Sequence, residues 1–169
     1  ILWGAGHGVT TMTFFAAFLN FRTGIMTFAN AGHNIPFLIP ASPTDPRLGN
    51  IGPKVEGKMQ KRMVPLQSKG TPLGMDAAST YTRQTMQLAP GDRLFLFTDG
   101  LIECKNRADT MWGKRRMQQT IEGLLTCPPD EMKTKTMQAA LTFFDGQPQD
   151  DDITVVVAEI APTWQLVQA

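Results

Sequence analysis

The side chains best suited to chemistry in this sequence are aspartates that flank two predicted strands. Asp99 follows the apolar segment 93–97, and three consecutive aspartates, 150–152, precede the apolar segment 153–160. If the two strands run antiparallel, the end of the first lies beside the start of the second, so the carboxylates meet at one edge of the sheet. Clustered carboxylates repel one another, and a hard divalent cation relieves that repulsion. Mn²⁺ or Mg²⁺ suits such a site, where it would supply a water nucleophile for phosphoester hydrolysis.

The same aspartates also fit a purely structural interpretation. Three aspartates before a strand can form a solvated loop, and Asp-Gly at 99–100 is common turn chemistry. Spacing alone therefore predicts only an acidic sheet edge that could hold a metal, and an α+β domain with solvated acidic turns stays open.

The strands expected around these aspartates belong to an antiparallel arrangement. Glycine in the Arg-Thr-Gly segment 22–24 predicts a hairpin turn, and residues 89–92 predict a turn that forms a second hairpin. Residues 41–74 are rich in Pro, Gly, Ser and Lys without a sustained period, which predicts a long surface excursion. We expect strands at 12–21, 25–30, 36–39, 80–88, 93–97 and 153–160.

Two helices are predicted between the last two strands. The first spans about 111–126 and presents one apolar face, and the second opens at Pro128 and closes at Gly146. This order of elements predicts an α+β fold rather than a parallel doubly wound one. The predicted apolar faces consist of Met117, Ile121, Leu124 and Leu125 in the first helix and of Met137, Leu141 and Phe144 in the second.

Composition narrows the class of protein. The 169 residues, 42% of them hydrophobic, suit a single domain over residues 1–169. With 16 basic and 15 acidic side chains the net charge is +1, so no broad field attracts nucleic acid or an anionic membrane. No apolar run approaches the roughly 18 residues that span a bilayer. The two cysteines form no CxxC or Cys/His cluster, so we expect a cytoplasmic domain without zinc.

Four segments resemble, in order and spacing, the SpoIIE-like branch of the PPM metal-dependent serine/threonine phosphatases of bacteria. Together they cover roughly residues 11–160, and the last two are the most specific. The segments are 28–34 (FANAGHN), 70–74 (GTPLG), 88–103 (LAPGDRLFLFTDGLIE) and 151–154 (DDIT).

The resemblance implies a largely antiparallel β-sandwich flanked by helices, with two Mn²⁺ or Mg²⁺ ions. In that family the Asp of Thr-Asp-Gly and the first Asp of Asp-Asp-Ile-Thr bind the metals, which implies Asp99 and Asp151 as ligands here. Gly100 and Asp152 would support these ligands without binding metal, and no catalytic residue beyond the ligands is implied.

The biological role implied by the resemblance is dephosphorylation of a phosphoserine or phosphothreonine protein in bacterial signalling. A STAS-type anti-sigma-factor antagonist is the implied substrate, in regulation of a sigma factor. An upstream sensor or receiver domain in the parent protein would control the activity.

The N-terminal segment departs from the family pattern. Residues 4–8 read Gly-Ala-Gly-His-Gly where the family has Gly-Asp-x-x-Gly-His-Gly, so the bridging aspartate is missing. The helices expected before the strand at 12–21 are missing too, either by truncation or deletion or because the sequence closes over a gap. An unpaired sheet edge would result, so we expect a longer parent protein. The departure leaves open a non-catalytic phosphatase-like interaction module that lacks a complete metal site.

Several other polar residues have simpler interpretations. His33 is expected to hydrogen-bond its own tight loop, and His7 to shape the loop at 4–8. Glu103 could orient a metal-bound water but is better explained as a surface residue. The basic side chains that could bind phosphate are expected to be solvated: Arg83, Arg93, Arg107, Lys114, Arg115 and Arg116.

Overall fold

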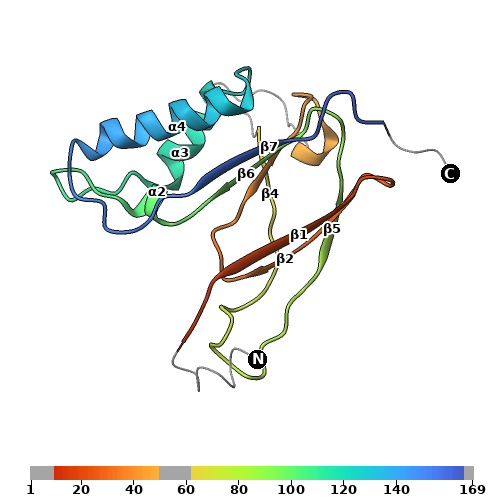
Figure 1. Ribbon diagram of the computed structural model, residues 1–169, viewed down its shortest axis with the longest axis horizontal. Helices are drawn as coiled ribbons and strands as arrows, with labels where there is room; N and C mark the ends of the chain where they lie inside the picture. The colour runs from red at the N-terminus through yellow and green to blue at the C-terminus, as the bar shows by residue number, and fades with distance from the viewer. Residues whose placement is uncertain (1–9, 50–61, 166–169) are drawn as a thin grey trace. The chain divides into compact units, whose positions relative to one another are not determined.

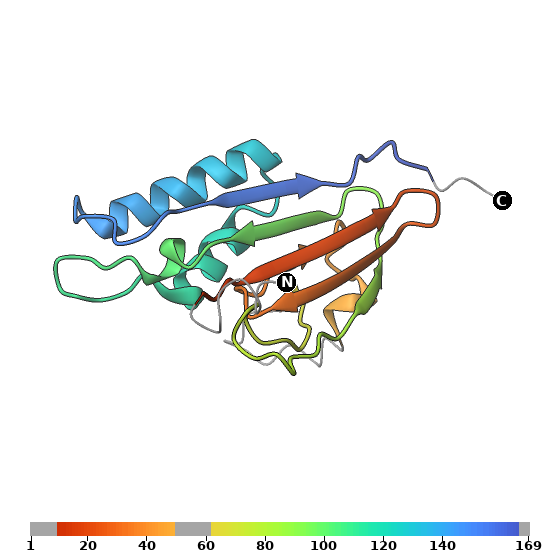
Figure 2. The same ribbon diagram turned by 60° about the horizontal axis from the view of Figure 1, so that its bottom comes forward.

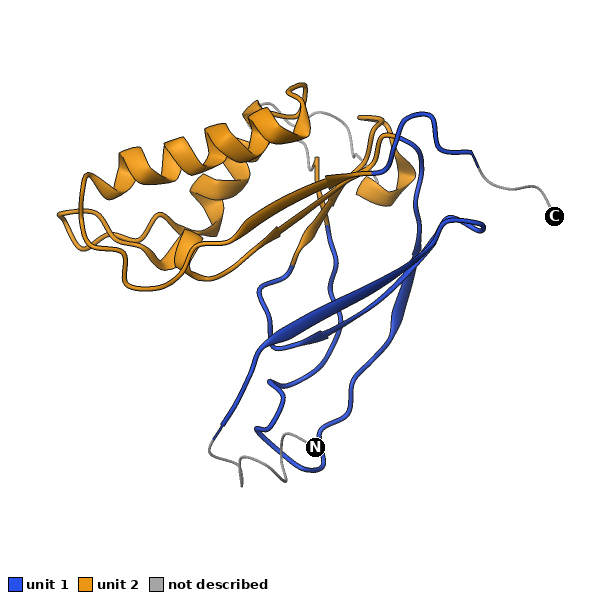
Figure 3. Ribbon diagram, in the orientation of Figure 1, with its two compact units in different colours: residues 1–35, 65–90, 160–169 blue, residues 36–64, 91–159 orange. Residues whose placement is uncertain are grey.

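The computed structural model describes residues 10–49 and 62–165 of the chain (Figure 1). These residues divide into two compact units, which Figure 3 colours separately. The first unit takes residues from 1–35, 65–90 and 160–169, and the second from 36–64 and 91–159. Within the described ranges, no helix reaches the length and apolarity that crossing a bilayer requires.

The first unit contains a three-stranded antiparallel sheet in the order β1-β2-β5. The strands β1 (Phe14–Asn20) and β2 (Ile25–Ala31) form the predicted hairpin, and β5 (Gln84–Gln87) pairs with β2 (Figure 2). Gly24 takes a positive φ of 72° in the turn, a conformation that glycine adopts without strain. The first predicted hairpin is therefore confirmed, although β1 begins two residues later than expected.

The second unit contains a four-stranded sheet in the order β4-β3-β6-β7. Its strands are β4 (Val64–Pro65), β3 (Phe37–Ile39), β6 (Arg93–Phe97) and β7 (Val155–Glu159). Both β3 and β7 run antiparallel to β6. A 3-10 helix, η1 (Pro46–Leu48), precedes β4.

The described residues of the second unit also form the helices α2 (Gly100–Glu103), α3 (Gly113–Gly123) and α4 (Pro129–Phe144). Figure 1 shows α4 lying along β7, with which it is in contact. The apolar core joins the sheet to these helices, and removal of its side chains from water stabilises the unit. Its most deeply buried members are Phe95, Leu101, Met117, Ile121, Met132 and Ala140.

The predicted apolar face of α3 is confirmed at Met117 and Ile121, whereas Leu124 and Leu125 lie beyond the end of the helix and are only partly buried. The predicted face of α4 is partly wrong. In α3, Met117 and Ile121 are fully buried. In α4, Leu141 is 54% exposed because the buried row runs four residues apart along the helix. That row consists of Met132, Thr136, Ala140 and Phe144.

The predicted second hairpin is wrong, because β5 and β6 belong to different sheets. Each end of the connection at 88–92 is attached to its own unit. The Leu88 amide donates to the Gly24 carbonyl at 2.8 Å in the first unit. The Asp92 carboxylate accepts from the Ala41 amide at 3.1 Å in the second. Apolar alternation on both sides of a turn therefore did not identify the pairing partners.

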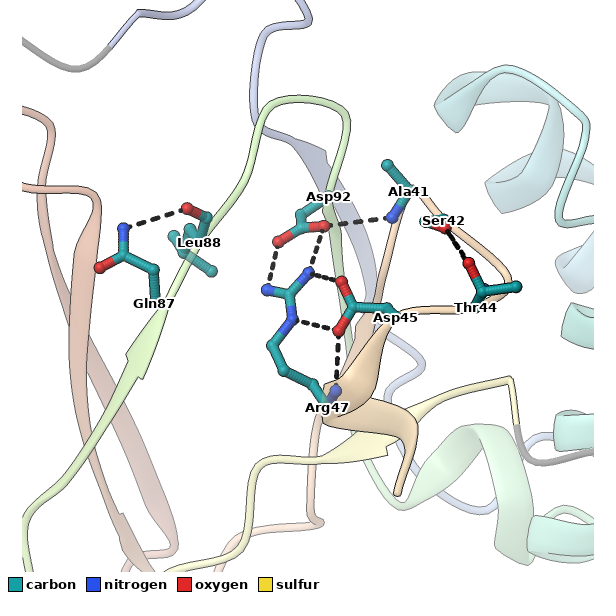
Figure 4. A network of polar contacts seen from close by, with 8 residues as sticks. All are labelled: Ala41, Ser42, Thr44, Asp45, Arg47, Gln87, Leu88 and Asp92. Carbon is teal, nitrogen blue, oxygen red and sulfur yellow. Dashed lines mark hydrogen bonds and ion pairs between the residues drawn. The ribbon is translucent and has the colours of Figure 1, made fainter. Parts of the chain in front are cut away.

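A polar network anchors part of the segment predicted as a surface excursion. Arg47 donates to both oxygens of Asp92, at 2.6 and 2.9 Å, and to both oxygens of Asp45, each at 2.8 Å (Figure 4). Asp92 is fully buried. The Arg47 guanidinium lowers the pKa of Asp45 by hydrogen bonding. The surface prediction is wrong here and also at Leu48, Met63 and Leu66, which are buried.

Candidate metal centre

Asp99 lies where β6 gives way to α2. It is half-buried, and its carboxylate accepts a hydrogen bond from the Gly100 amide at 3.2 Å. Its carbonyl accepts from the Ile102 and Glu103 amides at 2.8 and 2.9 Å, which fixes the turn. The side chain is therefore held at the end of the strand by the first turn of the helix.

The strand that follows the second acidic segment, β7, runs antiparallel to β6, as predicted. Phe97 is opposite Val155 at the end of the β6–β7 ladder. Beyond it, Thr98 donates from its hydroxyl to the Asp152 carbonyl at 2.9 Å and accepts from the Thr154 amide at 2.8 Å. These bonds bring the residue before Asp99 directly against the segment that carries the other aspartates.

Gly100 also packs closely against the acidic segment. A Cβ atom at this position would lie 2.6 Å from the Asp152 carbonyl oxygen and 3.0 Å from that of Asp151. Such distances are shorter than real Cβ contacts, so only glycine fits without a shift of the backbone. The Asp99-Gly100 turn thus packs on the backbone of the two acidic residues.

The carboxylates on the β7 side face solvent. Asp151 and Asp152 are exposed, and the Asp151 carboxylate accepts from the Asp152 amide at 2.8 Å. The charges of Asp150 and Asp151 act on Cys104, which follows α2 and is buried. Burial raises the pKa of the Cys104 thiol, a hydrogen bond with the Asp150 backbone partly offsets this rise, and the negative charges of Asp150 and Asp151 add smaller increases.

The donor chemistry at this edge fits Mn²⁺ or Mg²⁺, because carboxylate oxygens are the ligands that hard cations prefer. In the parts of the chain that the structure describes, no three His, Cys, Asp or Glu side chains gather into a group that could hold a metal ion. Residues 4–8, where the family places a bridging ligand, and His7 among them, lie outside the described residues.

The structure also shows the surroundings of two other candidates from the sequence, His33 and Glu103. The Asn30 side chain bonds both the amide and the carbonyl of His33, at 2.7 and 3.0 Å, and the His33 ring lies 3.3 Å from the Thr13 hydroxyl. Glu103 is exposed. These contacts give His33 a role in shaping the loop that follows β2.

Two arginines expected to be solvated make specific contacts instead. Arg93 donates to Glu159 at 3.1 Å and to the carbonyls of Leu125 and Cys127 at 3.2 and 2.7 Å. Arg116 lies 4.8 Å from the centre of the Phe143 ring. The prediction of solvated charge is wrong for Arg93, whose side chain is only 16% exposed and whose partners are distant in sequence, whereas Arg116 remains exposed to solvent.

The fold is that of PP2C-type phosphatase domains. The SiaA-PP2C domain of Pseudomonas aeruginosa superposes with a TM-score of 0.67 at 20% identity, covering 89% of this chain and 52% of that one. The RsbU and RsbW domains of a Mycobacterium tuberculosis protein give 0.67 at 19%, covering 95% and 40%. The Mn-presoaked phosphatase domain of SpoIIE from Bacillus subtilis gives 0.58 at 19%, covering 88% and 56%. The predicted α+β class with antiparallel sheets is confirmed.

The chain belongs to the SpoIIE family, whose model, described as stage II sporulation protein E, matches residues 4–161. Protein IcfG of Synechocystis is 26% identical over 152 residues, 89% of this chain and 21% of that protein. Stage II sporulation protein E of Bacillus subtilis is 30% identical over 112 residues, 63% of this chain and 13% of that protein. The chain thus spans only 21% and 13% of these two relatives, and the resemblance to the family is confirmed.

Proposed function

We propose that the protein is a Mn²⁺- or Mg²⁺-dependent phosphatase that acts on phosphoserine or phosphothreonine in a protein. The observation that carries this proposal is the antiparallel β6–β7 pair, which sets the Asp99-Gly100 turn against the backbone of Asp151 and Asp152. Asp99 and Asp151 would hold the cations. When bound, two cations would stabilise charge on the phosphoryl oxygens and activate a water for in-line attack.

The chain's own residues would position that chemistry. The first turn of α2 orients the Asp99 carboxylate, and the Thr98 hydroxyl ties the Asp152 carbonyl to the same edge. Gly100 permits the close approach of the two segments. Asp152 would support Asp151 through the hydrogen bond that its backbone amide donates to the Asp151 carboxylate. No covalent phosphoenzyme is needed, because water is the nucleophile.

The choice of Mn²⁺ or Mg²⁺ is supported by relatives with the same fold. The SpoIIE phosphatase domain was solved after presoaking with Mn, and RsbX, with a TM-score of 0.51, in complex with magnesium. Both are ions that the carboxylate donors at this edge suit.

The substrate that we propose is a phosphorylated STAS-type anti-sigma-factor antagonist in the bacterial cytoplasm, and the output is regulation of a sigma factor. A sensor or receiver domain elsewhere in the protein would control the activity. Support comes from relatives that join phosphatase domains to others: RsbU with RsbW domains in one, and a PP2C domain with part of a regulatory domain in SpoIIE.

The direct test is release of phosphate from phosphoserine and phosphothreonine peptides with Mn²⁺ and with a chelator. Asp99→Asn and Asp151→Asn should each lower turnover at least about tenfold, which corresponds to a loss of roughly 1.4 kcal/mol of transition-state stabilisation. Asp130→Asn is the matched control, because its side chain is 97% exposed at the start of α4. Unchanged turnover in Asp99→Asn would contradict the assignment of Asp99 as a metal ligand.

A non-catalytic interaction module is the second candidate. It is favoured by the finding that residues 10–49 and 62–165 bring no three potential ligands together. Such a module would bind a phosphorylated partner with the same affinity in the presence and absence of a chelator, and the Asp99→Asn variant would bind as tightly as wild type. It would release no phosphate. Partner binding that depends on Mn²⁺ and on Asp99 would exclude it.

A further inference from the structure

A polar hollow lies beside the acidic edge of the second unit. Its volume is about 240 Å³, and its walls come from the connection between α2 and α3 and from the segment that precedes β7. Figures 1 and 2 show these two loops side by side at one end of the unit. Asp150 lines the hollow and directly precedes Asp151, so a group bound here would lie next to the proposed metal ligands.

The size and lining of the hollow suit one polar side chain of a bound peptide. Small-molecule sites usually measure roughly 300–1,000 Å³ and are mostly apolar. This hollow is smaller, and every described lining residue except Pro148 carries a charged or amide side chain. A protein substrate bound through its phosphorylated residue would extend past the acidic edge, so a neighbouring side chain of that substrate is the occupant that fits best.

The loop that supplies most of the lining holds its shape by its own hydrogen bonds. The Asn106 side chain accepts from the Ala108 and Thr110 amides, each at 3.0 Å, and the Asn106 amide donates to the Thr110 carbonyl at 3.0 Å. Lys105 pairs with Asp109 at 2.7 Å across the same loop. Because the loop is already ordered, binding would not incur the entropic cost of fixing it.

Arg107 is the side chain of this loop that is best placed to bind an anion. Its Nε atom lies 2.9 Å from the Asp145 carboxylate, which anchors one side of the guanidinium, and the side chain is 72% exposed. Within residues 10–49 and 62–165, the structure shows no acceptor for its two terminal nitrogens. A guanidinium can bind both oxygens of a carboxylate through two parallel N–H groups, so Arg107 offers an anchored cation with donors available for a ligand.

The acidic side chains around the hollow are compatible with this contact. Asp109 is already paired with Lys105, and the exposed contact of Arg107 with Asp145 is of a kind that contributes little and rearranges readily. Asp150 would repel an incoming carboxylate, but divalent cations at the neighbouring metal centre would offset its charge. The hollow is therefore expected to accept a carboxylate when the metal centre is loaded.

We propose that Arg107 determines substrate specificity by binding the carboxylate of an aspartate or glutamate that lies close to the phosphorylated residue of the protein substrate. The proposal rests on the phosphatase activity proposed above, since the phosphorylated residue would be held at the neighbouring metal centre. The contact would strengthen the binding of acidic substrates and would leave the reacting phosphate untouched.

Phosphoserine peptides with a single Glu, or with Gln as its neutral counterpart, at successive positions on both sides of the phosphoserine test this proposal. In the presence of Mn²⁺, Glu should lower the KM of wild type roughly fivefold relative to Gln at one or two positions, because a bidentate contact is stronger than an ordinary exposed ion pair. Arg107→Gln should abolish this difference in KM, and Arg107→Glu should favour Lys at the same positions. The effect should appear in KM rather than in kcat, because the contact lies away from the reacting phosphate.

Arg115→Gln is the matched control, because Arg115 is also exposed but lies on α3 and is not among the described residues that line the hollow. It should retain the preference for Glu. Equal KM values for the Glu and Gln peptides at every position, with phosphate released from both, would overturn the role of Arg107 and leave the phosphatase assignment intact. An equal loss of the preference in Arg107→Gln and Arg115→Gln would also overturn it.

Peptide affinity measured by fluorescence anisotropy separates the two claims if no peptide releases phosphate, a result that would contradict the phosphatase itself. Tighter binding of the Glu peptides than of the Gln peptides by wild type, lost in Arg107→Gln but not in Arg115→Gln, would still support the contact. Equal affinities for the two sets of peptides would overturn it.

Discussion

At the scale of single residues, a polar network around Arg47 lies away from the candidate metal centre. Arg47 bridges Asp45 and buried Asp92 with four hydrogen bonds. Removing one member of such a group leaves a charge without its full set of partners, which costs more than the pair contributes when intact.

Asp92→Asn should therefore destabilise the fold by about 3 kcal/mol, the lower end of the range for a broken buried pair, because Asp45 continues to bind Arg47. Urea unfolding followed by circular dichroism measures the change, with Asp130→Asn as the exposed control. An unfolding midpoint equal to that of wild type would show that the network contributes little to stability.

The buried thiol of Cys104 predicts a pH dependence. Its pKa is raised in the folded state, first by burial, so folding favours the protonated thiol. The resulting stability is fully present below the unfolded thiol pKa of about 8.5 and is lost as the pH rises past it.

We expect the free energy of unfolding to fall between pH 8 and 9.5, and Cys104→Ala to flatten this decline. Cys127→Ser serves as the control, because Cys127 is only partly buried. A decline of the same slope in Cys104→Ala would contradict this origin. A thiol reagent should also label Cys127 in the folded chain and Cys104 only after unfolding.

At the scale of elements, the contact between the Asp99-Gly100 turn and the start of the β7 segment can be tested without touching a carboxylate. Gly100→Ala puts a Cβ atom 2.6 Å from the Asp152 carbonyl and must push the two segments apart. We expect Mn²⁺ affinity and phosphate release to fall together in this variant, because both aspartates remain but their spacing changes.

Gly123→Ala is the matched control for this substitution. A Cβ at Gly123 meets no atom within 4 Å, and alanine favours the α3 helix by about 0.5–1 kcal/mol. Unchanged Mn²⁺ affinity in Gly100→Ala would mean that the close approach does not position the ligands.

The sequence predicted the elements well where neighbouring residues determine the structure. The turn glycine at Gly24 and the alternation on both sides of it predicted the β1–β2 hairpin, and the repeat at Met117 and Ile121 predicted the buried face of α3. The motifs at Asp99 and Asp151 predicted which segments the antiparallel pair β6–β7 would bring to one edge.

The failures involve partners that local sequence does not specify. The turn at 89–92 connects two sheets because its ends bond Gly24 and Ala41, which are far away in the chain. The Arg47–Asp92 contact spans 45 residues and leaves no periodic signal. The sequence around Arg93 is that of a surface charge, because its partners, Glu159 and the carbonyls of Leu125 and Cys127, are distant in the chain.

At the scale of the whole molecule, this chain is a part of a larger architecture in its relatives. It covers 40% to 56% of the three PP2C-type chains compared above and 13% to 21% of the two full-length relatives. The edge at Asp99 and Asp151 supplies oxygen donors of the right kind, and metal-dependent phosphatase activity is the central claim.

Calorimetric titration of the protein with Mn²⁺ tests that claim most directly, with wild type, Asp99→Asn, Asp151→Asn and Asp130→Asn compared at one pH. We predict binding by wild type and Asp130→Asn, and an affinity at least about tenfold weaker in the other two, since each loses a ligand charge. Mn²⁺ binding by Asp99→Asn and Asp151→Asn with the affinity of wild type would contradict a metal centre at this edge.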